Sequence, residues 1–248
     1  MTELVGILNV TPDSFSDGGE FLDPAAAVAQ ADELFRSGAA LVDVGAESTR
    51  PNALPLSDNE EWARLEPVLS VLIPRYPGQI SLDSFHPATI DRAFGIGEVI
   101  VNDVTGMHDP LMVETVLKHQ ARCIISHLAP GMDIQTAHKL EPTASVEQVK
   151  FELLDRARLL ERRGLDPAKI ILDPGIGFGK RRELNPQLLR FAELVPDRTV
   201  MIGYSRKRFL GEHRLELAPN LAAGRIAIAS GARYLRVHDV AGHMQLLR

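Results

Sequence analysis

The chain has 248 residues, 45% of them apolar and 24% charged, and its formal net charge is −6 at pH 7. These proportions are ordinary for a globular protein. The acidic balance argues against nucleic-acid binding driven by overall charge, so we expect no nucleic-acid partner. No apolar run approaches the roughly 20 residues that span a bilayer, and no basic stretch precedes an apolar one at the start. We therefore expect a cytoplasmic protein with no membrane partner.

The single cysteine, Cys123, excludes a disulfide within the chain. It lies in the apolar run ARCIIS, and free cysteines are usually buried. We therefore predict an inert thiol, which suits a reducing compartment.

Short apolar runs recur along the chain and predict strands. They are rich in Val, Ile and Leu and lack strict polar alternation, which is typical of parallel strands buried on both faces. In chain order the predicted strands are Leu4–Asn9, Ala40–Gly45, Ile80–Asp83, Val99–Asn102, Arg122–His127, Lys169–Asp173, Thr199–Gly203 and Tyr234–His238.

The segments between the strands predict helices. Asp23 before Pro24, and Ser57 or Asp58, are suitable N-caps, and Gly164 is a suitable stop. The residues after His238 leave room only for a short last helix. The other predicted helices are Pro24–Ser37, Asp58–Leu72, Pro87–Phe94, Pro110–His119, Ser145–Arg163, Pro186–Leu194 and Pro219–Ser230.

The alternation of strand and helix predicts the fold class. Repeated βα units force parallel strands with right-handed crossovers. Eight units within roughly 250 residues favour an α/β fold, a (β/α)₈ TIM barrel, with residues 1–248 forming a single domain. A doubly wound sheet is the alternative, but no G-x-G-x-x-G follows the first strand.

Polar residues follow nearly every predicted strand. In a barrel the C-terminal strand ends form one rim, where active sites are built. Burying so many polar groups without a ligand would be costly, so the convergence predicts a ligand site. In strand order the residues are Asn9; Asp43, Glu47, Ser48, Thr49 and Arg50; Asp83; Asn102 and Asp103; Ser126 and His127; Asp173 and Lys180; Ser205, Arg206, Lys207 and Arg208; Arg236, His238 and Asp239.

Each of these residues also has a structural interpretation. A strand-end Asp often caps the next helix, and a basic run often forms a solvated face. A lone histidine such as His127 is more often a core or rim residue than a catalyst. Asp43, two residues inside its strand, fits a buried acid bonded to backbone N–H groups.

The mixture of charges indicates the kind of ligand. A cationic rim suits phosphate or pyrophosphate. Carboxylates and an amide deeper in the barrel recognise donor-rich, guanidine-like edges. The sequence thus predicts a donor-rich heterocycle with an anionic group at its other end. The rim residues are Arg50, Arg206, Lys207, Arg236 and His238, and the deeper ones are Asp83, Asn102 and Asp173.

The glycine-rich segment GIGFGK, Gly175–Lys180, lacks the spacing of a phosphate loop. Its glycines would let the backbone approach a flat ligand, with Phe178 as a wall. No cysteine and histidine cluster has zinc spacing, so a divalent ion would be a hard cation such as Mg²⁺, bound mainly through oxygens and substrate phosphates.

Seven segments together resemble one family. GILNVTPDSFSDGG, DVGAESTRP, SLDSF, VNDVTG, ILDPGIGFGK, YSRKRFLG and RVHD are similar, in this order, to the signature segments of the dihydropteroate synthases. The resemblance implies an enzyme that condenses 6-hydroxymethyl-7,8-dihydropterin pyrophosphate with 4-aminobenzoate and releases pyrophosphate. It also implies a homodimer, a Mg²⁺ ion, and sulfonamides as mimics of the aminobenzoate.

The same resemblance implies a role for each site residue, with Asp83, Asp173, Lys207 and Asn9 as the catalytic set. The implied pterin residues are Asp83, Asn102, Asp173 and Lys207. The implied pyrophosphate residues are Asn9, which also contributes to the Mg²⁺ site, Arg50, Arg236 and His238. The implied 4-aminobenzoate residues are Phe15, Thr49, Pro51, Phe178 and Ser205.

In the implied reaction, Asp83 and Asp173 stabilise positive charge on the pterin. The first loop acts as a lid that brings Phe15 over the site. Two alternatives remain open at this point. A methyltransferase that uses a methyl-folate shares the pterin residues but does not need the SRK and RVH cations. A catalytically silent paralogue would bind pterin or a partner enzyme.

Overall fold

The structure is a computed structural model and describes residues 1–11, 23–47, 56–134, 136–137 and 140–248. The predicted site residues Phe15, Thr49, Arg50 and Pro51 lie outside the described residues.

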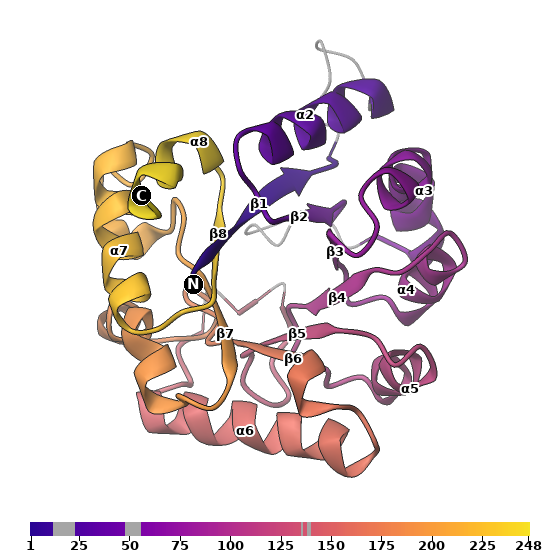
Figure 1. Cartoon of the computed structure of the whole chain (residues 1–248). Coiled ribbons are helices and arrows are strands. Elements are labelled where there is room, and N and C mark those ends of the chain that lie inside the picture. Colours follow the sequence, from indigo (N-terminus) through magenta and orange to yellow (C-terminus); the bar gives the residue numbers. More distant parts are fainter. Residues whose placement is uncertain (12–22, 48–55, 135, 138–139) are drawn as a thin grey trace.

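The strands form a closed barrel in sequential order, with β1 pairing with β8, and the helices surround it (Figure 1). Every pairing between neighbouring strands is parallel, which confirms the predicted (β/α)₈ fold. The strands are β1 (Glu3–Asn9), β2 (Leu41–Gly45), β3 (Ile80–Asp83), β4 (Ile100–Asp103), β5 (Cys123–Ser126), β6 (Ile170–Asp173), β7 (Thr199–Gly203) and β8 (Tyr234–Val237).

The helices follow the predicted order, and most of their bounds lie within a few residues of the prediction. The α-helices are α2 (Pro24–Arg36), α3 (Asp58–Arg75), α4 (Pro87–Phe94), α5 (Pro110–Lys118), α6 (Val146–Arg162), α7 (Leu217–Ala229) and α8 (Val240–His243). The 3₁₀ helices are η1 (Pro167–Lys169), η2 (Arg182–Leu184), η3 (Gln187–Leu194), η4 (Arg208–Leu210) and η5 (Met244–Leu246).

The capping residues begin the helices where the sequence predicts. The Asp23 side chain accepts a hydrogen bond from the Ala25 N–H at 2.9 Å, and Ser57 forms a capping box with Glu60. One helix type differs from the prediction, because Gln187–Leu194 is a 3₁₀ helix. The apolar pattern fits both helix types, so packing against the barrel decides between them.

Cys123 is fully buried at the start of β5. Burial raises the pKa of its thiol to about 12, which makes it inert as predicted.

Two layers of side chains fill the barrel. Seven strands each contribute one apolar residue to a separate buried cluster, made of Val5, Leu41, Ile100, Ile124, Ile171, Met201 and Tyr234. Side chains along a strand alternate, so the residues two positions later point the same way, one layer nearer the mouth. Six of these later residues are Asp43, Asn102, Ser126, Asp173, Gly203 and Arg236. The interior therefore changes from apolar to polar over two residues of strand.

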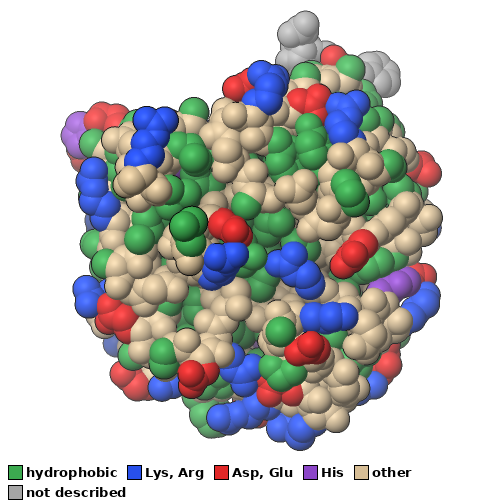
Figure 2. All heavy atoms as spheres, in the orientation of Figure 1, with side chains coloured by type: hydrophobic (Ala, Val, Ile, Leu, Met, Phe, Trp, Pro, Cys, Tyr) green, Lys and Arg blue, Asp and Glu red, His purple; other side chains and the backbone are tan. Residues whose placement is uncertain are grey.

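The outer surface shown in Figure 2 carries acidic and basic side chains interspersed with apolar ones. No single sign of charge dominates that face, in keeping with the modest net charge of −6. Among the described residues, none of the helices is long and apolar enough to cross a bilayer.

Candidate active site

The polar layer of the barrel lines a pocket at the carboxyl ends of the strands. Six of the predicted site residues lie together there, namely Asp83, Asn102, Asp173, Phe178, Lys207 and Arg236. The remaining lining residues are Val104, Ser126, Gly175 and Gly203. The pocket thus joins side chains from β3 to β8 that are far apart in the sequence.

Arg236 lies between two carboxylates within the pocket. Its Nε donates to Asp43 Oδ2 at 2.5 Å, and its Nη2 donates to Asp83 Oδ2 at 2.5 Å. Burial alone would lower the pKa of Arg236, but the two carboxylates outweigh this effect and raise it. Arg236 was expected on an outer cationic rim, and this expectation is wrong. Its ion pairs with Asp43 on β2 and Asp83 on β3 place the guanidinium at the same depth in the barrel as those two carboxylates.

Asp43 lies beside the pocket and contacts two of its lining residues, Arg236 and Asn102. It is fully buried as predicted, but its partners are side chains rather than backbone N–H groups. Asn102 Nδ2 donates to its two oxygens at 3.2 and 3.0 Å. Strand alternation could have predicted this position. Asp43 follows Leu41 of the interior apolar layer by two residues, so its side chain points into the barrel as well.

Asp83 and Asn102 are direct register partners on β3 and β4. Burial raises the pKa of Asp83 to about 7, against the lowering effect of Arg236 and with a further rise from Asp43. The side-chain NH₂ group of Asn102 donates to Asp43. The buried Oδ1 of Asn102 has no hydrogen-bond partner among the described residues. The pair thus presents acceptor oxygens to a ligand.

Asp173 and Lys207 form the other side of the pocket. Asp173 Oδ1 accepts from the Gly175 N–H at 2.7 Å, and Lys207 Nζ donates to the Ile176 carbonyl. The same ammonium lies 5.0 Å from the centroid of the Phe178 ring, a cation–π distance. Burial raises the pKa of Asp173, and burial lowers the pKa of Lys207 to about 8. A Cβ on Gly203 would lie 3.3 Å from Asp173 Oδ2, so a glycine leaves this wall open.

Two glycines of GIGFGK also pack closely against a neighbouring loop. Gly175 has φ +64°, and a Cβ there would lie 2.2 Å from the His127 carbonyl oxygen. Gly179 has φ +59°, and its Cβ would meet the Met132 sulfur at 2.5 Å. These two glycines permit close packing against the connection after β5, and Gly175 and Phe178 of the same segment line the pocket.

Ser205 and His238 form a pair beside the pocket. His238 Nδ1 lies 3.0 Å from Ser205 Oγ, and the His238 backbone N–H donates to the same oxygen at 3.3 Å. The residues expected at the aminobenzoate and at the pyrophosphate are therefore neighbours at the ends of β7 and β8. Asn9 is exposed at the end of β1, opposite Gly45 of β2 in the register.

Two other strand-end acids, Asp103 and Asp239, have structural roles. Asp103 accepts from the N–H groups of Thr105 and Met107, and Asp239 caps α8 by accepting from the Gly242 N–H at 2.8 Å. Arg206 is exposed. Helix capping explains Asp239, and the backbone N–H groups of the turn after β4 hold Asp103.

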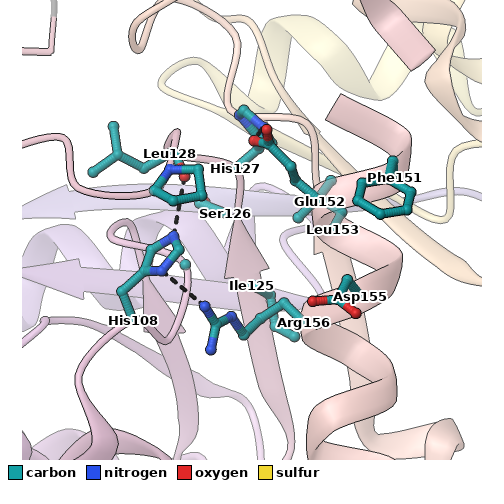
Figure 3. A pocket seen from close by; sticks show the side chains of 12 residues that line it. His108, Ile125, Ser126, His127, Leu128, Phe151, Glu152, Leu153, Asp155 and Arg156 are labelled. Carbon is teal, nitrogen blue, oxygen red and sulfur yellow. Dashed lines mark hydrogen bonds and ion pairs between the residues drawn. The ribbon is translucent and has the colours of Figure 1, made fainter. Parts of the chain in front are cut away.

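A second cavity of about 250 Å³ lies between the end of β5 and α6, and Ser126 lines both cavities (Figure 3). Behind Ser126, Lys180 Nζ donates to His127 Nδ1 at 2.9 Å, and His127 Nε2 contacts Glu152 Oε2 at 2.8 Å. Burial lowers the pKa of His127 to about 2 and that of Lys180 to about 7. The imidazole is therefore neutral and fully engaged, which fits the structural interpretation of His127.

The donor set near β1 fits Mg²⁺ in one respect. Asn9 offers a neutral amide oxygen at the exposed barrel mouth, and Mg²⁺ is usually bound by one or two protein oxygens together with substrate phosphates.

Comparison with known proteins agrees with this arrangement. A family model described as pterin binding enzyme matches residues 5–238. The dihydropteroate synthase of Bacillus subtilis is 34% identical over 96% of this chain and 84% of its own length. The chain belongs to the dihydropteroate synthase family.

Two solved dihydropteroate synthases share the fold closely. That of Xanthomonas albilineans with 4-aminobenzoic acid has a TM-score of 0.86 and 34% identity, covering 99% of this chain and 90% of its own. That of Burkholderia cenocepacia with 7,8-dihydropteroate has a TM-score of 0.86 and 32% identity, covering 100% of this chain and 89% of its own. The dihydropteroate synthase barrel thus accounts for nearly all of the chain.

Proposed function

We propose that this chain, as one domain of residues 1–248, condenses 6-hydroxymethyl-7,8-dihydropterin pyrophosphate with 4-aminobenzoate to give 7,8-dihydropteroate and pyrophosphate. The observation that carries the proposal is the pocket in which Asp83, Asn102, Asp173 and Lys207 converge. Membership of the dihydropteroate synthase family supports the same reaction.

The pterin ring is a flat heterocycle with N–H donors along one edge. In this proposal the carboxylates of Asp83 and Asp173 and the unpartnered Oδ1 of Asn102 accept from those donors. Lys207 donates to a ring acceptor, and its contact with Phe178 holds the ammonium in place.

The reaction breaks the bond between the pterin methylene carbon and the pyrophosphate oxygen, whose electron pair leaves with pyrophosphate. Positive charge then develops on the pterin, and the two buried carboxylates stabilise it. The aniline nitrogen forms the new C–N bond and loses one proton. No residue need act as a covalent nucleophile.

The leaving group needs positive charge and hydrogen-bond donors. Arg236 has five N–H donors, and the two ion pairs with Asp43 and Asp83 leave others for the pyrophosphate. His238 and Arg50 are the further proposed contacts, with Asn9 as the protein ligand of Mg²⁺. When bound, this ion would neutralise charge on the departing pyrophosphate.

The aminobenzoate is proposed to lie between Phe178 and Ser205 on the described side of the site. Phe15, Thr49 and Pro51 complete that set from segments outside the described residues. The proposal includes a homodimer, supported by apolar side chains exposed around α7, such as Leu215 and Ile226.

The deciding experiment measures pyrophosphate release from the pterin pyrophosphate with and without 4-aminobenzoate. We expect release that depends on the aminobenzoate, and a loss of about a hundredfold in Lys207→Ala, as for removal of one preorganised charge. Lys118→Ala, on the exposed surface of α5, is the control and should keep full activity. A methyltransferase or a silent paralogue would release no pyrophosphate, and that result would refute the proposal.

A further inference from the structure

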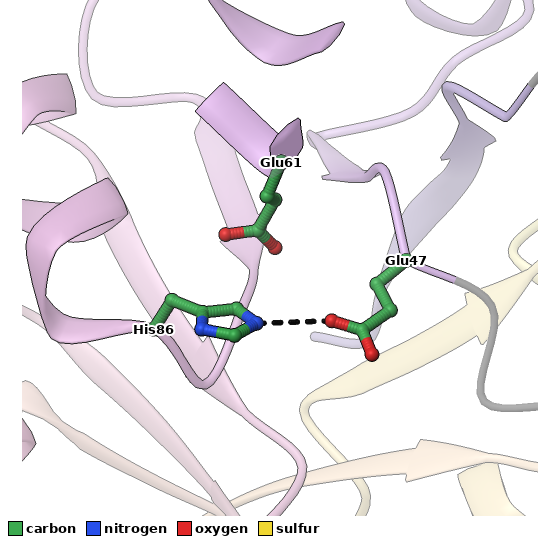
Figure 4. Close-up of side chains that lie close together, drawn as sticks. All are labelled: Glu47, Glu61 and His86. Atoms are coloured by element: carbon green, nitrogen blue, oxygen red, sulfur yellow. Dashed lines mark hydrogen bonds and ion pairs between the residues drawn. The ribbon is translucent and has the colours of Figure 1, made fainter. Parts of the chain in front are cut away.

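A second group of ionisable side chains lies outside the pterin pocket, where β2, α3 and β3 meet. Glu47 follows β2, Glu61 is in the first turn of α3, and His86 is the N-cap residue of α4. One potential ligand atom from each residue lies within 4.8 Å of the others, and Figure 4 shows the three side chains facing one another. None of the three lines the pocket that holds Asp83 and Lys207.

We propose that Glu47, Glu61 and His86 form a binding site for a divalent transition-metal ion such as Zn²⁺ or Mn²⁺. The site is separate from the proposed Mg²⁺ position at Asn9. The inference does not depend on the proposed catalytic activity.

The side chains are held as metal ligands usually are. Asp58 Oδ1 lies 2.7 Å from Nδ1 of His86, and Nε2 of the same ring faces Glu47 Oε2 at 3.0 Å. A carboxylate on one imidazole nitrogen fixes the tautomer and points the other nitrogen at the metal. The side chains of Glu47 and His86 are 5% and 15% exposed, so the group is shielded from water.

Glu61 supplies an independent indication that a ligand is missing. The residue is fully buried, and the Ser84 hydroxyl donates to its Oε2 at 2.8 Å. Oε1 has no hydrogen-bond partner among the described residues. A buried carboxylate oxygen without a partner is costly, and coordination to a cation would satisfy it.

An ion pair alone explains less of this arrangement. Without a metal, a protonated His86 would pair with Glu47 and Asp58, and Glu61 Oε1 would still lack a hydrogen bond among the described residues. A divalent ion would balance the two ligating carboxylates while Asp58 orients the neutral ring. Imidazole with carboxylates suits Zn²⁺ and Mn²⁺, whereas Mg²⁺ prefers oxygen ligands.

The geometry is close to that needed for coordination. Ligand atoms about 2.1 Å from a tetrahedral Zn²⁺ lie about 3.4 Å from one another. The His86–Glu47 separation of 3.0 Å is near this value, and no pair in the group exceeds 4.8 Å. Rotation of the side chains would complete the site, and water would fill the fourth position. The bound ion would link the end of β2 to the starts of α3 and α4.

The test uses the full-length, tag-free chain after removal of metals with a chelator. Calorimetric titration should show one Zn²⁺ ion bound per chain, and thermal unfolding should show a higher melting temperature with Zn²⁺ than without it. Titration with Mg²⁺ should show no binding at these residues. Bound Co²⁺ should give the visible absorption of a site that includes a nitrogen ligand. Asp58→Asn should weaken Zn²⁺ binding about 10-fold to 100-fold, as for other carboxylates that orient a ligand histidine.

Two variants separate the metal site from the ion pair. His86→Lys keeps a cation between the carboxylates but removes the imidazole, so it should fold and lose stoichiometric Zn²⁺ binding. His119→Ala removes the histidine of an exposed pair with Asp91 on another helix and should bind Zn²⁺ normally. If His86→Lys does not fold, Asp58→Asn decides the question. A folded wild-type chain that takes up no Zn²⁺, or binding unchanged in both His86→Lys and Asp58→Asn, would overturn the proposal.

Discussion

Asp43→Asn tests whether the acid on β2 holds Arg236 in place. In the structure the two oxygens of Asp43 accept from Arg236 on one side and from Asn102 on the other. Asparagine has one acceptor oxygen, so its NH₂ group would face a donor. We expect the substitution to lower both the free energy of unfolding and the turnover.

The magnitude follows from these contacts. A hydrogen bond to a charged group contributes about 1.5–3 kcal/mol, and breaking a buried ion pair costs about 3–5 kcal/mol. Arg236 keeps Asp83, and the loss of repulsion between the two carboxylates offsets part of the cost. We therefore expect a loss of about 2–3 kcal/mol, or about 5–10 °C in Tm for a chain of this size.

Thermal unfolding and steady-state kinetics check this prediction. Asp43 does not line the pocket, so its effect on kcat/KM, expected to be about tenfold or more, would act through the orientation of Arg236. Asp32→Asn is the matched control, because Asp32 pairs with Arg75 on the surface at 2.7 Å and such pairs contribute about 0–1 kcal/mol. Equal Tm values for the two variants would refute the reasoning.

Two further predictions follow from the site. Gly175→Ala should unfold at a much lower temperature than Gly131→Ala. Both glycines have positive φ, but only a Cβ on residue 175 would meet the His127 carbonyl. Similar melting curves for the two variants would contradict this prediction. Burial lowers the pKa of Lys207 to about 8, so kcat/KM should be high below that pH and fall above it as the ammonium loses its proton. Lys207→Arg should remove the fall, since guanidinium stays charged, and a fall that persists would assign it to another group.

The sequence by itself determined the order of the elements and the location of the site. Apolar runs marked the strands, caps such as Asp23 and Ser57 marked helix starts, and polar residues at strand ends marked the mouth. These features are local, because strand periodicity and capping depend on neighbouring residues. Asp83 and Asp173 could therefore be assigned to one pocket before any coordinates were known.

Only the tertiary structure decided which charges meet. Barrel closure brings β8 back to β1 and sets the level of each side chain, so Arg236 pairs with Asp43, a residue 193 positions earlier. The pairing of β2 with β3 and the packing of α3 over them make Glu47, Glu61 and His86 neighbours, although Glu47 and His86 are 39 positions apart in the sequence. Such contacts depend on the strand register and on the partners that each buried polar group finds. Register and partners are fixed only in the assembled barrel, so no local sequence pattern predicts them.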